Sequence, residues 1–280
     1  MKTTNAMQLK AKIKARAKAS NVSPQLMMQD YLLERLLVRI STSEWSSCFI
    51  LKGGMLIASL IGVDSRVTKD LDTTITGFAL THESLKAIFE EICEIEADDD
   101  LSFKFTRTED IRETDDYPGI RVFLKALYNP MAVTLSVDVT TGDAITPRAI
   151  EYEYPLMFDK DSVKLMAYPV CTCLAEKLET VVTRGIANTR PRDYYDIVML
   201  WNARKDTIDL ETLREAITAT CAKRSSDSQI LQYRDVMKQV ANDAGILARW
   251  KTYANNYGYV GSLTLCDACE TVINILNEAL

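Results

Sequence analysis

Histidine is nearly absent from the sequence, and its scarcity narrows the chemistry that the chain can perform. Only one of the 280 residues, His82, is a histidine. A metal centre built from several histidines is therefore excluded. Catalysis by a Ser-His-Asp or Cys-His arrangement is disfavoured as well, because His82 would have to be the only base. Acid–base or metal chemistry must then depend on carboxylates and lysines.

Long apolar runs are missing too. No stretch approaches the roughly 20 apolar residues that a membrane-spanning helix needs, and the first residues are polar and rich in lysine. We therefore expect a cytoplasmic protein with no membrane partner. The composition, 47% hydrophobic and 26% charged over 280 residues, is typical of a globular chain with one large domain or two of ordinary size.

The seven cysteines do not form the even set of a secreted disulfide framework. Cys266 and Cys269 have CxxC spacing, and Cys171 is close to Cys173, but no second CxxC pair or histidine lies near either pair. Buried, reduced thiols are therefore favoured over a metal or redox site.

Positive charge is concentrated at the start of a chain whose net charge is −6, because every charged residue before Asp30 is basic. Such a block can contact the phosphates of a nucleic acid, although the solvent-facing side of a helix can have the same composition. An N-terminal helix that contacts RNA is thus one hypothesis. The block consists of Lys2, Lys10, Lys12, Lys14, Arg16 and Lys18.

The first part of the chain predicts helices followed by a mixture of strands and helices. Apolar residues recur at helical spacing over residues 7–19 and again after Pro24, which suits a first helical turn. A short strand is expected at "CFILKGG", a helix at "MLIASLIG" and a second strand at "KDLDTTI".

The middle of the chain predicts one helix and then a run of strands. An amphipathic pattern favours a helix over residues 82–97. The sequence Tyr128-Asn129-Pro130 indicates a turn that joins two strands into an antiparallel hairpin. From about residue 168 onward the pattern is helical, so a domain boundary is expected near residue 165. The expected strands are "FKFTRT", "GIRVFLKAL" and "AVTLSVDVT".

Three aspartates are the candidate centre of the chemistry. Asp70 and Asp72 lie one residue apart on an expected strand, so both project to the same face, and Asp138 lies on a later strand. If these strands are neighbours, the carboxylates can converge, and their mutual repulsion then calls for cations. Oxygen ligands suit Mg²⁺, and two such ions support phosphoryl transfer. Solvated aspartates on a polar strand edge are the alternative.

Two glycines precede these aspartates and have an interpretation of their own. Gly53 and Gly54 open the expected helix, where backbone amides without an obstructing Cβ can approach phosphates. Lys52, the residue before them, is a further candidate for nucleotide binding. Gly-Gly, the spaced aspartates and a later strand aspartate are together more specific than any one of them.

A second informative stretch is "LAEKLETVVTRGIANTRPRDYYDIVML". Lys177 and Arg184 are seven residues apart, so they share one helix face. Asp193 and Asp196 open the next helix, where acidic residues are favoured. A lysine can neutralise the phosphates of a nucleotide and an arginine can clamp one. A surface helix pair with an aspartate cap and an ordinary salt bridge explains the same spacing.

Together these motifs resemble the AbiEii type of abortive-infection nucleotidyltransferase toxin, a branch of the DNA polymerase β-like nucleotidyltransferase superfamily. The resemblance covers roughly residues 8–200. It implies an α+β fold: a nucleotidyltransferase domain over residues 1–165, with a mixed sheet flanked by helices, and a helical domain over residues 166–280. It is carried by the N-terminal helices, by "FILKGGMLIA", "SRVTKDLDTTI" and "LSVDVTTGD", and by the stretch from Leu174 to Leu200.

The resemblance implies roles for the first group of residues. Asp70 and Asp72 match the metal-binding pair, and Asp138 matches the third acidic position. Gly53 and Gly54 match the turn that binds nucleotide phosphates. Many members of the superfamily have Gly-Ser at that turn, so this chain lacks a hydroxyl there and would use backbone amides.

The resemblance also implies roles for the second group. Lys177 and Arg184 match the KLxxxxxR motif of the family, and Arg190 and Asp193 match its RxxD motif. The lysine and the aspartate of these motifs are needed for toxicity in the family. An aliphatic residue often follows the aspartate, whereas this chain has Tyr194.

The function that the resemblance implies is that of a Mg²⁺-dependent nucleotidyltransferase, the toxin of a bacterial toxin–antitoxin pair with a role in phage defence. It would transfer a nucleotidyl group from an NTP to an RNA acceptor, the 3′ end of tRNA being expected. A cognate antitoxin encoded nearby is the implied partner. Two alternatives stay open: a transferase that modifies a protein hydroxyl, and a catalytically silent nucleotide-binding module that acts through a partner.

Overall fold

The computed structural model shows two compact units. The first comprises Met1–Gly142 and Ile150–Ala167, and the second comprises Asp143–Ala149 and Tyr168–Leu280. Residues 143–149, which the expected boundary near residue 165 assigns to the first domain, belong to the second unit. The functional assignment of the two domains stays a prediction. The structure describes residues 3, 5–62, 66, 68–111, 119–159 and 161–280.

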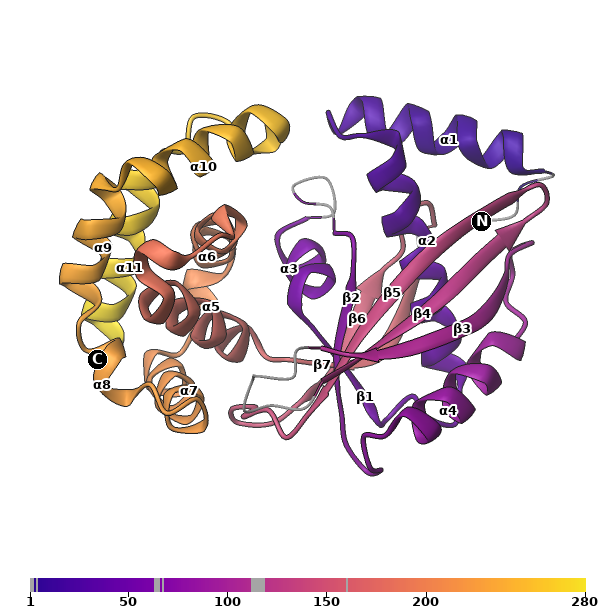
Figure 1. Ribbon diagram of the computed structural model, residues 1–280, viewed down its shortest axis with the longest axis horizontal. Helices are drawn as coiled ribbons and strands as arrows, with labels where there is room; N and C mark the ends of the chain where they lie inside the picture. Colours follow the sequence, from indigo (N-terminus) through magenta and orange to yellow (C-terminus); the bar gives the residue numbers. More distant parts are fainter. Residues whose placement is uncertain (1–2, 4, 63–65, 67, 112–118, 160) are drawn as a thin grey trace. The chain divides into compact units, whose positions relative to one another are not determined.

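The described residues of the first unit form one seven-stranded mixed sheet (Figure 1). Its strand order is β3-β4-β5-β2-β1-β7-β6. The pairs β2–β5 and β1–β7 are parallel, and all other neighbours are antiparallel. The strands are β1 (Phe49–Lys52), β2 (Leu71–Ile75), β3 (Ser102–Asp110), β4 (Gly119–Tyr128), β5 (Met131–Thr141), β6 (Ile150–Pro155) and β7 (Ser162–Ala167).

One face of this sheet is apolar and carries the core of the unit. Alternation places Leu71, Val137 and Val139 on it, and all three are fully buried. Helices α2 and α4 pack against this face. Phe89 of α4 contacts Phe49 edge-on, with ring centroids 5.7 Å apart. The helices of the unit are α1 (Ala6–Ala19), α2 (Pro24–Thr42), α3 (Gly53–Ile61) and α4 (His82–Glu94).

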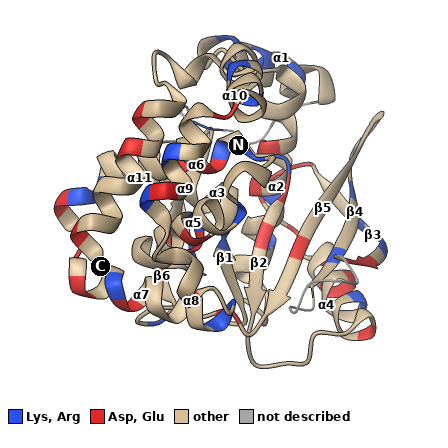
Figure 2. Cartoon of the chain, turned by 60° about the vertical axis from the view of Figure 1, so that its left-hand side comes forward, with Lys and Arg blue, Asp and Glu red and all other residues tan. Residues whose placement is uncertain are grey.

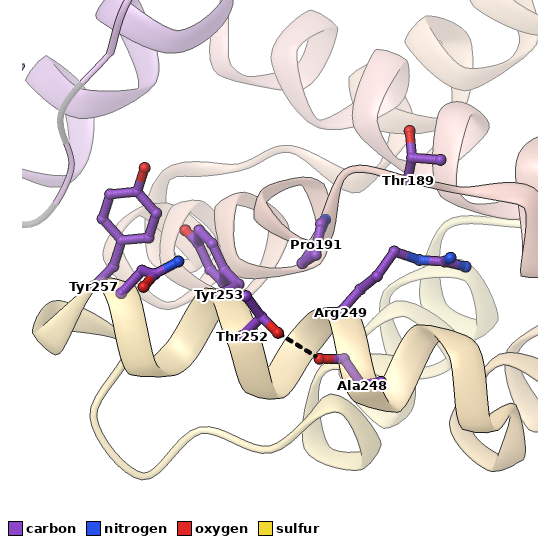
Figure 3. Close-up of a pocket in the computed structure, with 8 residues that line it drawn as sticks. Thr189, Pro191, Ala248, Arg249, Thr252, Tyr253 and Tyr257 are labelled. Atoms are coloured by element: carbon purple, nitrogen blue, oxygen red, sulfur yellow. Dashed lines mark hydrogen bonds between the residues drawn. The ribbon is translucent and has the colours of Figure 1, made fainter.

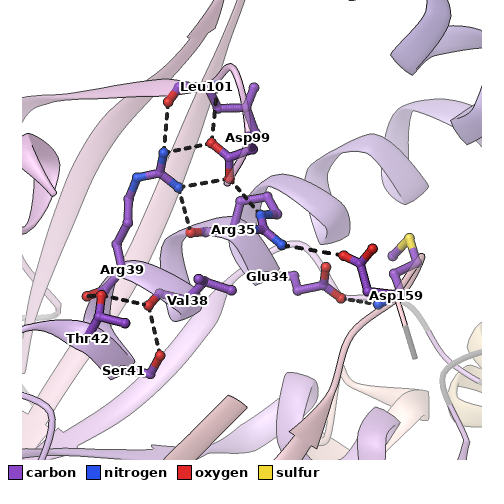
Figure 4. A network of polar contacts seen from close by, with 10 residues as sticks. Glu34, Arg35, Val38, Arg39, Ser41, Thr42, Asp99, Leu101 and Asp159 are labelled. Atoms are coloured by element: carbon purple, nitrogen blue, oxygen red, sulfur yellow. Dashed lines mark hydrogen bonds and ion pairs between the residues drawn. The ribbon is translucent and has the colours of Figure 1, made fainter. Parts of the chain in front are cut away.

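Helix α2 is anchored to the sheet by a buried polar network (Figure 4). The Arg39 guanidinium lies over the Phe103 ring, and it shares the Asp99 carboxylate with Arg35 at distances of 2.7–3.1 Å. Burial alone would raise the pKa of Asp99, but the two guanidinium groups hold it below its ordinary value. Glu34 accepts a hydrogen bond of 2.5 Å from the Met157 amide. The network therefore gives the buried charges of Arg35, Arg39 and Asp99 partners, as burial requires.

The structure confirms the α+β fold, with the predicted strands, the hairpin and the two N-terminal helices in place. Helix α4 ends at Glu94 rather than at residue 97, because Ile95 takes an extended conformation. Strands β6 and β7 are not predicted by the sequence analysis. In these two strands only Tyr154, Leu165 and Ala167 are buried, and several exposed positions are polar. The strands therefore lack the strongly apolar alternation of β5.

From Tyr168 onward the second unit is helical, apart from short connections (Figure 1). The stretch "YGYVGSLTL", whose residues alternate weakly, forms a 3₁₀ turn, Gly258–Val260, and the start of a helix. That helix opens with a capping box made by Thr264 and Asp267. The helices are α5 (Val170–Arg184), α6 (Pro191–Arg204), α7 (Leu210–Lys223), α8 (Asp227–Ile230), α9 (Tyr233–Asn242), α10 (Ala244–Asn256) and α11 (Leu265–Ala279).

All seven cysteines are free. Cys171, Cys173 and Cys269 are buried, and Cys266 is exposed. Burial raises the pKa of the Cys269 thiol to about 12, so this CxxC cysteine is held in the protonated form and is a poor metal ligand. Of the helices within the described ranges, none has the length and the apolar character that crossing a membrane would take.

Candidate active site

The candidate site of the first unit is built on two parallel strands. Asp72 on β2 and Asp138 on β5 occupy directly paired positions, and paired residues on neighbouring parallel strands project to the same face about 4.8 Å apart. This face is opposite the apolar one, because alternation points Leu71 and Val137 the other way. Figure 2 shows acidic bands side by side on these two strands. The structure thus brings together two of the three predicted aspartates.

Asp72 lies against the beginning of α3. Its Oδ2 accepts a hydrogen bond of 3.3 Å from the Gly54 amide. Burial raises the pKa of Asp72, and the neighbouring charges of Asp138 and Asp70 raise it further, while the Gly54 amide and Lys52 act in the opposite direction. Asp72 is therefore a carboxylate that a nearby cation would stabilise in its ionised form.

Asp138 already has a cationic partner. Arg121, its neighbour on β4, donates from Nε to Oδ1 at 2.6 Å and from Nη2 to Oδ2 at 2.7 Å. This two-point geometry is the strong form of an arginine–carboxylate pair. The hydrogen bonds to Asp138, ahead of its charge, raise the pKa of Arg121.

A row of charged side chains crosses the sheet at this level. Lys52 on β1 pairs with Asp72, Asp72 with Asp138, and Asp138 with Arg121. We call these four residues the charged row. Lys52 also donates from Nζ to the hydroxyl of Thr140 at 2.7 Å. Opposite charges thus flank the two aspartates on both sides.

Asp70 stands directly before β2 and is held by a serine. Ser136 on β5 donates its hydroxyl to Asp70 Oδ1 at 2.6 Å. Ser136 lies two residues before Asp138 on the same face of the strand. Asp70 therefore belongs to the same polar face as the charged row, one alternation away from Asp72.

The two glycines have a packing reason in this structure. Gly53 has φ +62°, and a Cβ added to it would lie 2.1 Å from Asp72 Oδ2. A Cβ on Gly54 would lie 2.4 Å from the Arg66 guanidinium, which is buried and donates to the Gly54 carbonyl at 2.7 Å. The glycines thus let α3 begin against Asp72, and the approach of phosphates to their amides stays a prediction.

The donor chemistry at this face fits a divalent cation. No three His, Cys, Asp or Glu side chains within the described residues meet as ligands of one metal ion. Asp70, Asp72 and Asp138 nevertheless supply oxygen ligands of the kind that Mg²⁺ prefers. The crowding that raises the pKa of Asp72 would be relieved by such a cation.

The predicted motifs of the second unit meet between α5 and α6. Lys177 on α5 donates to Asp193 Oδ1 at 2.5 Å and lies 3.0 Å from Asp196 Oδ2. The lysine side chain is 18% exposed, whereas those of Asp193 and Asp196 are 4% and 0% exposed. Asp193 is therefore an ion-pair partner of Lys177 rather than a helix cap. Its second oxygen, Oδ2, is buried and has no hydrogen bond within the described residues.

The two arginines of these motifs lie elsewhere. Arg184 is the last residue of α5, and Arg190 is the residue before the first turn of α6. Both are exposed. The backbone amide of Arg190 donates a hydrogen bond of 2.8 Å to the side-chain oxygen of Asn188.

The comparisons with known proteins identify the family of the chain. The family model described as "Nucleotidyl transferase AbiEii toxin, Type IV TA system" matches residues 35–272. This chain belongs to the AbiEii family. It is therefore a nucleotidyltransferase of a toxin family that acts in type IV toxin–antitoxin systems. A comparison with curated proteins gave no match.

One solved structure supports the fold of this AbiEii protein, and a second has a lower similarity. A proposed nucleotidyltransferase from H. pylori superposes with a TM-score of 0.54 at 13% identity, covering 92% of this chain and 94% of that one. JHP933 from Helicobacter pylori has a TM-score of 0.49 at 13% identity, covering 92% and 91%. At this identity, the first match shows that the overall fold is shared.

Several residues of the candidate site were missed by the sequence analysis. Arg121, Ser136 and Arg66 contact Asp138, Asp70 and Gly54 respectively. The partner of Asp138 could have been found from the predicted hairpin, because a tight turn at Asn129-Pro130 fixes which residues face each other on β4 and β5. Arg66 lies in the connection between α3 and β2, where no periodic signal exists.

Proposed function

We propose that this AbiEii protein transfers a nucleotidyl group from an NTP to an RNA acceptor, with the 3′ end of tRNA as the expected site. Asp70, Asp72 and Asp138 would hold Mg²⁺. The observation that carries the proposal is the direct pairing of Asp72 with Asp138 on neighbouring parallel strands. Two carboxylates at this separation, with a third on the same face, suit a cation that also binds phosphates.

The remaining groups of the first unit have roles that follow from their charge. When bound, Mg²⁺ would favour attack by the acceptor oxygen and stabilise the leaving phosphate. Lys52 and Arg121 place positive charge at the two ends of the charged row, where phosphate oxygens can be oriented. The start of α3 at Gly53 offers the positive end of a helix dipole to the same anion.

The second unit contributes residues that the family resemblance implies. We include Lys177 and Asp193 as residues required for the reaction, and Arg184 and Arg190 as nucleotide contacts. Both arginines are exposed and so can reach a phosphate. The ion pairs of Lys177 hold α5 against α6, so its requirement would include a structural part.

Helix α1 is the proposed contact for the RNA backbone. Lys10, Lys12, Lys14 and Lys18 are exposed on it, while Leu9, Ile13 and Ala17 are buried on the opposite side. A basic surface of this kind binds phosphates without sequence preference. Lys2 lies outside the described residues. A cytoplasmic location, a role in phage defence and a cognate antitoxin encoded nearby complete the proposal.

The test is a transfer assay with separate acceptors. The protein is incubated with each α-labelled NTP and Mg²⁺ in the presence of total tRNA or of total protein, and the label is followed in each fraction. We expect label on tRNA, and loss of at least about 100-fold of the rate for Asp72→Asn, since several kcal/mol of metal-dependent stabilisation are removed. Label on protein alone would contradict the RNA acceptor. No label anywhere, together with unchanged toxicity of Asp72→Asn on induced expression, would favour the silent module.

A further inference from the structure

The second unit contains a pocket of about 370 Å³ that none of the predicted motifs uses. It lies between α10 and the segment that leads into α6 (Figure 3). Arg249 and Tyr253 of α10 and Tyr257, the residue after that helix, line it on one side, and Thr189 and Pro191 line it on the other. The pocket therefore adjoins Arg190, the first residue of the RxxD motif.

The wall formed by α10 is a regular row of side chains. Arg249 and Tyr253 are four residues apart and share one face of α10, and Tyr257, the extended residue that follows the helix, continues the row. The rings of Tyr253 and Tyr257 are 5.1 Å apart, and Tyr259 lies 5.4 Å from Tyr257. Figure 3 shows Tyr257 at one end of the pocket and Arg249 at the other. The tyrosine cluster holds its rings in place by mutual contact and thus offers a rigid aromatic surface.

The guanidinium of Arg249 has only part of its hydrogen-bonding capacity satisfied by the described residues. Its Nη2 donates to the Ile186 carbonyl at 3.3 Å, and its Nε is buried without a hydrogen bond in the described part of the chain. The loop across the pocket is basic, because residues 184–192 include three arginines and no acidic residue. None of the described residues that line the pocket is acidic. The pocket thus combines an aromatic wall with positive charge.

We propose that this pocket binds an unstacked nucleotide at a single-stranded end of the RNA acceptor. Its base packs against Tyr257 and Tyr253, and a phosphate binds Arg249. Splayed bases on aromatic rings with an arginine beside them are the usual means of recognising single-stranded RNA. The proposal rests on the proposed function in taking RNA as the acceptor. A nucleotide within RNA is favoured over a free NTP, since no lining carboxylate is present to hold the metal that accompanies a triphosphate.

The test measures binding without catalysis. A fluorescein-labelled single-stranded RNA of about ten nucleotides and a blunt duplex of the same length are titrated with the full chain in EDTA, without NTP. We expect Tyr257→Ala to weaken binding of the single strand about tenfold, the effect of losing one stacked base, and to leave the duplex unaffected. Tyr257→Phe keeps the ring and should bind as the wild type does.

Charge is tested by a matched pair on the same helix. Arg249→Gln should weaken binding of the single strand, whereas Lys251→Gln removes the same charge from an exposed residue outside the pocket lining and should have little effect. The proposal is overturned if Tyr257→Ala binds the single strand as tightly as wild type, or if the two charge variants are equally weakened. It is also overturned if ATP in EDTA displaces the RNA in a Tyr257-dependent way, since the pocket would then belong to the free nucleotide.

The transfer assay separates this proposal from the proposed function. Tyr257-dependent binding of the single strand without any nucleotide transfer contradicts the proposed function and leaves the pocket assignment standing. Transfer to tRNA at the same rate and KM in wild type and Tyr257→Ala contradicts the pocket assignment alone. Thermal unfolding of each variant confirms that the compared proteins are folded.

Discussion

Arg121 on β4 donates hydrogen bonds to both carboxylate oxygens of Asp138 on β5, at 2.6 and 2.7 Å. The same aspartate pairs in register with Asp72 on its other side. If Asp138 holds Mg²⁺ as proposed, the Arg121 guanidinium and the metal ion compete for one carboxylate. Arg121 is 39% exposed and Asp138 is 18% exposed, so the ion pair is partly screened by solvent and can be exchanged at modest cost.

We expect Arg121→Gln to strengthen Mg²⁺ binding about fivefold. In the variant, Mg²⁺ no longer has to displace an ion pair that stabilises Asp138 by about 1 kcal/mol. Isothermal titration of the protein with Mg²⁺, without nucleotide, measures this. Arg107→Gln is the control, since Arg107 pairs with Glu109 on the neighbouring strand β3. Weaker Mg²⁺ binding in Arg121→Gln would instead mean that Arg121 orients Asp138 for the metal.

Gly53 and Gly261 form a matched pair for testing why the first glycine is needed. Both have positive φ, +62° and +61°, but a Cβ on Gly261 meets nothing within 4 Å, whereas one on Gly53 meets Asp72. Gly261→Ala should therefore lower the free energy of unfolding by about 1–3 kcal/mol, the cost of holding a residue with a Cβ at a positive φ. Gly53→Ala should cost more, about 2–4 kcal/mol, because Asp72 or the start of α3 must also move. Urea unfolding measures both, and equal losses would rule out the steric explanation.

Lys177→Ala is expected to destabilise the protein by about 3–5 kcal/mol. The substitution removes the ammonium group between the buried carboxylates of Asp193 and Asp196, and breaking a buried ion pair from one side leaves an uncompensated charge. A decrease in Tm of several degrees should accompany the loss of activity. Lys164→Ala, at an exposed pair with Glu151, should leave Tm nearly unchanged. If Lys177→Ala keeps the wild-type Tm and is still inactive, the role of the lysine is chemical.

The stability of the protein should fall as the pH rises toward 8. Burial raises the pKa of Glu34 to about 8, and burial raises that of Asp30 to about 7. The folded state therefore retains protons that the unfolded state has released above about pH 4.5. The free energy of unfolding then decreases with pH, by up to about 1.4 kcal/mol per unit for each group, until its folded pKa is passed.

Glu34→Gln isolates one of these groups. The amide oxygen can still accept from the Met157 amide and carries no charge to desolvate. We expect the variant to be more stable than wild type at pH 8 by about 1 kcal/mol or more, with the difference shrinking toward pH 5. Urea unfolding at pH 5, 7 and 8 provides the comparison. A variant less stable than wild type at every pH would show that Glu34 is ionised and paired in the folded state.

The elements with a clear periodic signal were predictable. The hairpin of β4 and β5 follows from two alternating runs and the turn at Asn129-Pro130. Helix α1 buries Leu9, Ile13 and Ala17 as helical spacing predicts. Strands β6 and β7 escaped prediction because many of their residues are exposed and polar, so that no apolar alternation marks them.

The candidate site was predictable in its members but not in its contacts. The spacing of Asp70 and Asp72, and the later strand position of Asp138, identified the acidic face. The partners of these residues come from strand order: Arg121 and Ser136 meet them only because β5 lies between β4 and β2.

By itself, the sequence determined what the local chain can do. Alternation sets which side of a strand each aspartate occupies, and helical spacing places Lys177 on the face that meets α6. Only the tertiary structure decided that Asp72 lies beside Asp138 and that Arg121 forms an ion pair with Asp138. The same holds for Lys177, which lies between two carboxylates. Strand order and helix packing depend on how much apolar surface is buried across the whole unit. The spacing of neighbouring residues does not specify that burial.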